Sequence, residues 1–92
     1  MNVQINVAQQ PDGSLAPSPF GEGVAIVTMN DDRTAIIMFA GMNQAVVNFD
    51  DTGTQPLNYT LFNPMADLST QLTVENLIRH ISSMAQLPAV LH

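Results

Sequence analysis

The sequence of 92 residues contains no cysteine and no lysine. The absence of cysteine excludes disulfides and thiolate metal ligands, so neither can reinforce a small fold. For a chain of 9.9 kDa, surface scaling allows about 64% of the unfolded surface to be buried. We therefore expect a single domain over residues 1–92, with a small core that is well packed or shared with another subunit.

Charged residues are also scarce: they make up 11% of the chain, against about 25% in average domains. The only basic residues are Arg33 and Arg79, and the formal net charge is −6. Nucleic-acid binding needs Lys and Arg to neutralise phosphates, so no nucleic acid is expected as a partner. The surface must consist largely of amides, hydroxyls and apolar atoms. Such a surface is partly covered by a partner, or belongs to a neutral structural component, or is simply adequate for solubility.

No apolar run reaches the roughly 18 residues that a membrane span requires. The N-terminal residues also lack the basic start and apolar run of a signal peptide. The sequence therefore predicts no membrane partner. It predicts a cytoplasmic location, or a virion if the protein is a viral component.

The N-terminal residues alternate between apolar and amide side chains, which predicts a half-buried strand or arm over residues 1–8. Residues 9–23 hold three prolines and three glycines and predict a long loop, which would leave the arm free to pair with its own sheet or with a neighbour's. Four further strand-like runs follow at 24–29, 34–40, 45–49 and 57–62. Their short connections require antiparallel pairing, so residues 24–62 should form a meander.

The run 34–40 is apolar on both of its faces. This pattern predicts a central strand, covered by a helix on one side and by another layer on the other side. That other layer could be supplied by a second subunit.

The C-terminal segment has apolar residues at helical spacing and predicts an amphipathic helix over 73–87, with a stripe of Val74, Leu77, Ile78, Ile81, Met84 and Ala85. Thr73 is the expected N-cap, and Pro88 is expected to end the helix near Gln86. Residues 63–72 are assigned to a turn or a short separate helix, because their apolar residues would point away from that stripe in one straight helix. The predicted fold class is α+β: an antiparallel β-meander of four to five strands packed by one C-terminal amphipathic helix.

The motifs that suggest chemistry are weak. The triplet Asp51-Thr52-Gly53 occurs in aspartic proteases, but its flanking residues differ from that family's, so we interpret it as a loop. Asp31-Asp32 and Asp50-Asp51 lack the ligand spacing of a calcium loop and are typical of turns. His80 lies beside the helix stripe without an evident catalytic partner. We predict that the protein is not an enzyme and has no catalytic, cofactor-binding or metal-binding residues.

The remaining hypothesis is a structural or protein–protein interaction protein, of the kind found among small viral or mobile-element accessory proteins, as a virion component or an inhibitor of a host protein. Its partner would be itself, as a homo-oligomer, or another protein. The predicted interface residues are Val3, Ile5, Val7, Phe20, Arg33, Ile37 and Phe39. The alternative is a small-molecule-binding module with an apolar pocket between sheet and helix, lined by methionines such as Met29, Met38, Met42, Met65 and Met84.

Overall fold

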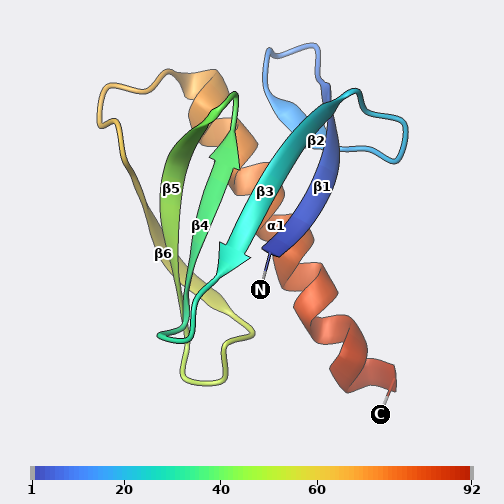
Figure 1. The fold of residues 1–92 in the computed structure, drawn as a ribbon, viewed down its shortest axis with the longest axis vertical. Helices are drawn as coiled ribbons and strands as arrows, with labels where there is room; N and C mark the ends of the chain where they lie inside the picture. Colours follow the sequence, from blue (N-terminus) through green and yellow to red (C-terminus); the bar gives the residue numbers. More distant parts are fainter. Residues whose placement is uncertain (1, 92) are drawn as a thin grey trace.

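A computed structural model describes the backbone of residues 2–91 and the side chains as far as Ser83. Within these residues the chain forms a six-stranded antiparallel sheet, and one C-terminal helix packs on one face of the sheet (Figure 1). The predicted α+β meander is therefore confirmed, with one strand more than the upper estimate. The elements are β1 (Asn2–Gln9), β2 (Leu15–Pro17), β3 (Gly23–Met29), β4 (Thr34–Phe39), β5 (Met42–Phe49), β6 (Pro56–Leu61) and α1 (Leu68–Leu91).

The order of strands across the sheet is β2-β1-β3-β4-β5-β6. Strands β3 to β6 form the meander that the short connections predicted. The β4–β5 turn has positive φ at both Ala40 and Gly41, the conformation that suits a tight two-residue hairpin. Consecutive strands are therefore neighbours in the sheet, with one exception: β2 and β3 are separated by β1, because β2 pairs with the edge of β1 that faces away from β3.

The N-terminal strand is part of this sheet rather than an arm on a long loop. Strand β1 pairs with β3 from Asn2 to Val7, and the predicted loop contains β2, which pairs with the other edge of β1. Strand β2 is fixed to the helix, because the Leu15 N–H donates to Thr73 Oγ1 at 2.8 Å. The following loop packs closely on β1: a Cβ atom at Gly21 would lie 2.2 Å from the Val7 carbonyl oxygen. Proline and glycine here shape a compact strand connection.

The helix begins five residues earlier than predicted. The Asp67 carboxylate accepts hydrogen bonds from the Thr70 N–H at 3.0 Å and the Thr70 hydroxyl at 2.8 Å, so Asp67 is the N-cap. Thr73, the predicted cap, lies within the helix and donates to the Ser69 carbonyl oxygen at 2.8 Å. The helix also continues past Pro88 to Leu91, since a proline removes one backbone donor without obliging a helix to end.

The predicted break between a short turn and a separate helix was wrong, and exposure explains why. Met65 lies in the turn before α1 with 86% of its surface exposed, and Leu68 in the first turn of α1 is 67% exposed. One straight helix is therefore compatible with the sequence, because these apolar residues need not be buried. Of the predicted stripe, Val74, Leu77 and Ile81 are buried, whereas the side chains of Met84 and Ala85 lie outside the described residues.

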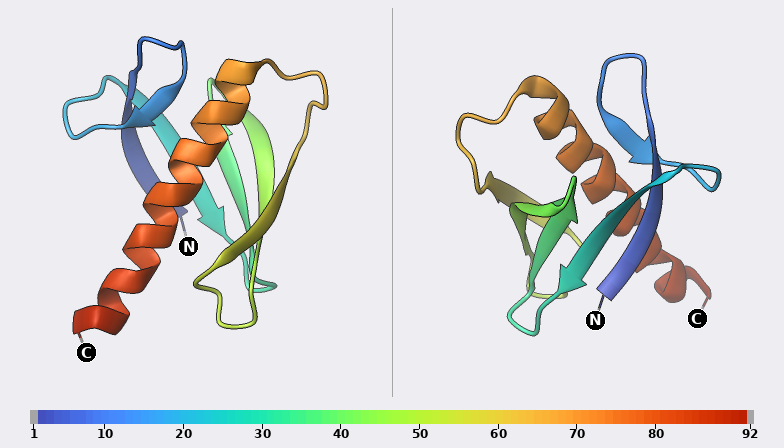
Figure 2. Two further views of the ribbon diagram at one scale, coloured as in Figure 1. Left: turned by 180° about the vertical axis from the view of Figure 1, so that it is seen from behind. Right: turned by 45° about the horizontal axis from the view of Figure 1, so that its top comes forward.

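The core lies between the sheet and α1. Helix α1 crosses one face of the sheet diagonally, and its C-terminal end extends beyond β1 (Figure 2). The strands contribute Ile5, Val7, Ala25, Val27, Ala35, Ile37, Phe39, Ala45, Val47 and Phe49 to the core, and the helix contributes the three buried stripe residues. We call this covered side of the sheet the inner face and the opposite side the outer face. No element of residues 2–91 covers the outer face.

Candidate functional site

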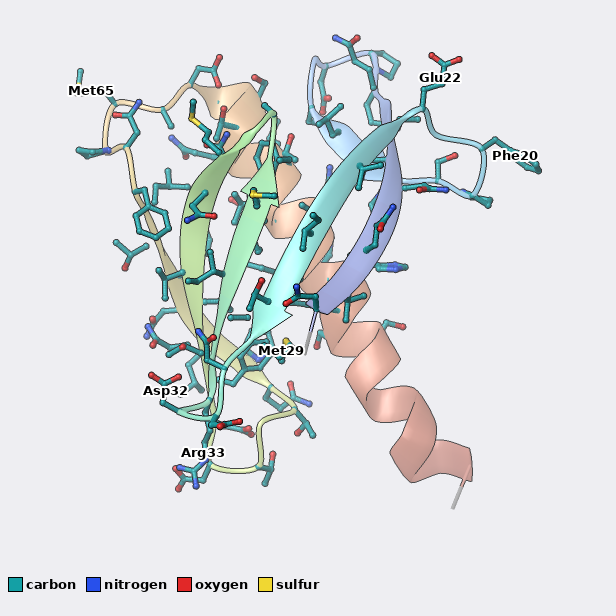
Figure 3. The ribbon with its side chains drawn as sticks, viewed as in Figure 1. Phe20, Glu22, Met29, Asp32, Arg33 and Met65 are labelled. Atoms are coloured by element: carbon teal, nitrogen blue, oxygen red, sulfur yellow. The ribbon has the colours of Figure 1, made fainter. Side chains whose placement is uncertain are left out.

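The seven residues predicted to form an interface do not lie together on the surface. Four of them, Ile5, Val7, Ile37 and Phe39, are part of the core and are at most 5% exposed. In this fold they have no surface to offer a partner. Val3 is partly buried at the edge of the same cluster. Phe20, which is 92% exposed, projects from the β2–β3 connection, and Arg33 lies at the opposite end of the sheet (Figure 3).

The outer face carries a block of apolar side chains at its centre. Strand pairing places Ile26 beside Met38, and it places Ile36 beside Val46. Val24, on the same face of β3, is 43% exposed. Together these five residues form what we call the outer apolar patch. The strands present no charged side chain on this face, and its polar residues around the patch are Asn2, Gln4, Asn6, Thr28, Thr34, Asn48, Asn58 and Thr60.

No charged residue occurs in any of the six strands. All eight acidic residues and both arginines lie in the connections or in α1. Three of these acids accept hydrogen bonds from residues two or three positions later in the chain. Hydrogen bonds from the hydroxyl groups of Ser14, Thr52 and Thr70, above all, lower the pKa values of Asp12, Asp50 and Asp67, respectively. The negative charge is therefore distributed around the sheet and is absent from its faces.

A groove lies along the exposed edge of β1 and has a volume of about 510 Å³. Val3 to Asn6 form one side, the segment from Pro17 to Pro19 forms one end, and His80 of α1 contributes from the helix. Ser18 is the only hydroxyl-bearing residue in this lining, and His80 is the only titratable one. Among the described residues no hydrogen bond joins the Ser18 hydroxyl to His80; Ser18 Oγ instead accepts from the Phe20 N–H at 3.4 Å.

A smaller groove of about 200 Å³ lies between β6 and α1. In it the Tyr59 hydroxyl donates to Glu75 Oε2 at 2.9 Å. Burial, together with this hydrogen bond and the negative charge of Glu75, raises the pKa of Tyr59 above its usual value of 10.0. Arg79 is directed elsewhere and donates to Asn76 Oδ1. The pair therefore fixes β6 to the helix, and no reactive group lies beside it in the groove.

The acidic pairs in the turns form no cation site. No group of three or more His, Cys, Asp or Glu residues within the described part of the chain is arranged to hold a metal ion. Arg33 lies 3.6 Å from Asp51, with both side chains exposed, so this ion pair contributes little to stability. Asp51-Thr52-Gly53 lies in the β5–β6 connection, where Gly53 adopts a positive φ of 72°.

Sequence reasoning detected part of this surface and missed the rest. The run 34–40, which is apolar on both of its faces, was the signal that a second side of the sheet is apolar. The β1 groove gave no signal, because it exists only where the short strand β2 leaves half of the edge of β1 uncovered. That geometry cannot be read from local patterns.

No helix of the described residues is both long enough and apolar enough to cross a membrane. Comparison with known proteins adds no identification: no protein-family model, no curated protein and no solved structure matches this chain.

Proposed function

We propose that this chain is a non-enzymatic assembly protein that binds a second copy of itself through the outer face of its sheet. The observation that carries the proposal is the outer apolar patch, which lies at the centre of a face without charged strand residues. Apolar side chains on an open face gain about 25 cal/mol for each Å² that a partner removes from water. Here the apolar residues are contiguous across three strands.

The charge distribution favours a second copy as the partner. Two chains that each carry −6 repel each other least when they meet at surfaces without charge. The outer face meets that condition, because the acids lie in the connections and in α1. A basic partner protein would instead be attracted to those acidic turns. Two sheets packed face to face lie about 10 Å apart and interdigitate alternate side chains, which suits the neighbouring cross-strand pairs Ile26–Met38 and Ile36–Val46.

The test is the absolute mass in solution, measured by light scattering on a sizing column over a range of concentrations. The wild-type chain should have twice the chain mass of 9.9 kDa. Ile36→Glu and Val24→Glu, made singly, should give monomers, because each places a carboxylate without a basic partner in the buried interface. Val24 is already 43% exposed in the single chain, so its variant should fold normally.

The matched control is Leu68→Glu. It also replaces an exposed apolar residue with an acid, but in the first turn of α1, away from the outer face, where negative charge suits the helix N-terminus. This variant should remain a dimer. A wild-type chain that is monomeric at every concentration would contradict the proposal, as would a dimer that survives both outer-face substitutions.

A further inference from the structure

Half of the edge of β1 has unpaired backbone groups. Strand β2 pairs only with Val7, Ala8 and Gln9. The Ser18 N–H donates to the Asn6 carbonyl oxygen at 2.9 Å, so the polar backbone groups of Asn6 point away from β3. Backbone direction alternates along a strand, and those of Gln4 and Asn2 therefore point the same way. Among the described residues nothing pairs with them, and Gln4 and Asn6 lie in the lining of the 510 Å³ groove.

This edge also lacks the features that normally prevent strand addition. Edge strands are usually protected by lysine, by inward-pointing charge, by proline or by a bulge. Strand β1 contains no charged residue and no proline, and no register shift interrupts its pairing with β3. Pro17–Pro19 line the groove at the Asn6 end, where the Ser18 N–H donates to the Asn6 carbonyl oxygen, and Val3 and Ile5 line it further along β1, so an additional strand would have a defined register.

The position of α1 determines which kind of strand can pair with the exposed edge of β1. The helix extends past the edge of β1, so an added strand would lie over α1 just as β1 does (Figure 1). A second copy whose β1 pairs antiparallel with this edge would bring its own α1 to the same face of the joined sheet, where it would meet this chain's helix. A single extended segment without a helix avoids that conflict.

We infer that the exposed edge of β1 binds an extended peptide segment of a different protein, which adds to the sheet as a strand beside Asn2–Asn6. The segment is apolar at alternate positions, because every second side chain faces α1 beside Val3 and Ile5. It contains no acidic residue, since no Lys or Arg is among the described residues that line the groove and the chain carries a net charge of −6. This inference does not rest on the outer-face dimer, which uses a different surface.

The experiment selects eight-residue peptides from a randomised displayed library on the full-length wild-type chain. The selected peptides are then synthesised with a fluorescent label and titrated by anisotropy against wild type, Gln4→Pro and Gln4→Ala. Proline at residue 4 removes an outward-facing N–H without breaking the β1–β3 ladder, a substitution that edge strands tolerate. The alanine variant removes the same side chain and keeps the N–H.

The selected peptides should alternate apolar residues and lack acids. Their Kd should rise about tenfold or more in Gln4→Pro and stay close to the wild-type value in Gln4→Ala. Circular dichroism checks that both variants fold. If Gln4→Pro does not fold, hydrogen exchange on the wild-type complex decides, because the amides of Asn2 and Gln4 should gain protection. Equal binding to both variants, protection elsewhere, or the absence of any enriched peptide would overturn the inference.

Discussion

The two faces of the sheet are both apolar at their centres, yet only one of them is packed by the chain itself. Ile36 and Ile37 are neighbours in β4 and make the contrast directly. Ile37 is completely buried beneath α1, whereas Ile36 lies on the open outer face and is only partly buried by its neighbours on the sheet. The contrast shows that apolar patterning specifies where a layer can pack and leaves open which molecule supplies it.

The largest effect should come from truncating the inner face. Ile37→Ala removes a completely buried side chain from the core and should lower the free energy of unfolding by about 2–5 kcal/mol. Ile36→Ala makes the same chemical change one residue away and should cost about 1 kcal/mol in the monomer. Denaturant unfolding at a concentration where light scattering shows single chains measures both. Equal losses would mean that the two faces are packed alike in solution.

The fold could be predicted largely because its signals are local. Alternation at the N-terminus, short connections and the spacing of Val74, Leu77 and Ile81 each report on a few adjacent residues. The position of β1 between β2 and β3 could not be predicted, because it depends on long-range contacts such as the hydrogen bond from Leu15 to Thr73. The helix start was missed because exposed Met65 and Leu68 were assumed to need burial.

The candidate site divides in the same way. The uncharged face could be anticipated from composition, since it requires only that the strands lack charge. The individual interface residues could not, because alternation alone does not say which side of a strand the helix will cover. Ile5, Val7, Ile37 and Phe39 were selected for their apolar character and are all on the covered side.

A loss of stability of intermediate size is expected when a threonine hydroxyl is removed from the inner side of the sheet, and a smaller one when it is removed from the outer face. Thr73 is 2% exposed and accepts the hydrogen bond from the Leu15 N–H. Thr73→Val preserves the shape of the side chain but leaves that donor without its acceptor, which should cost about 1–3 kcal/mol. Thr28→Val is the same replacement on the outer face and should change stability by about 0.5 kcal/mol or less. Thermal unfolding of the two variants makes the comparison, and a larger loss for Thr28→Val would contradict it.

The smallest effect concerns the rim of the inner face, where Tyr59 of β6 bonds Glu75 of α1. The chain has one tyrosine and no tryptophan, so its ultraviolet absorbance between pH 9 and pH 12, about the range where tyrosine titrates, reports this hydroxyl alone. Burial is the leading cause of the raised pKa, and Glu75 adds to it. Glu75→Gln should therefore lower the pKa of Tyr59 while leaving it above 10.0.

The sign of the linked stability follows from that pKa. The Tyr59 hydroxyl binds its proton more tightly in the folded state than in the unfolded chain, so it stabilises the fold at pH values below its unfolded pKa of 10.0. This contribution is lost as the pH rises through the higher pKa of the folded state. Wild type should thus lose slightly more stability than Tyr59→Phe as the pH is raised above 10.0. Identical pH profiles for the two proteins, or a Tyr59 pKa at 10.0 in the wild type, would show that water reaches this rim as freely as it reaches the outer face.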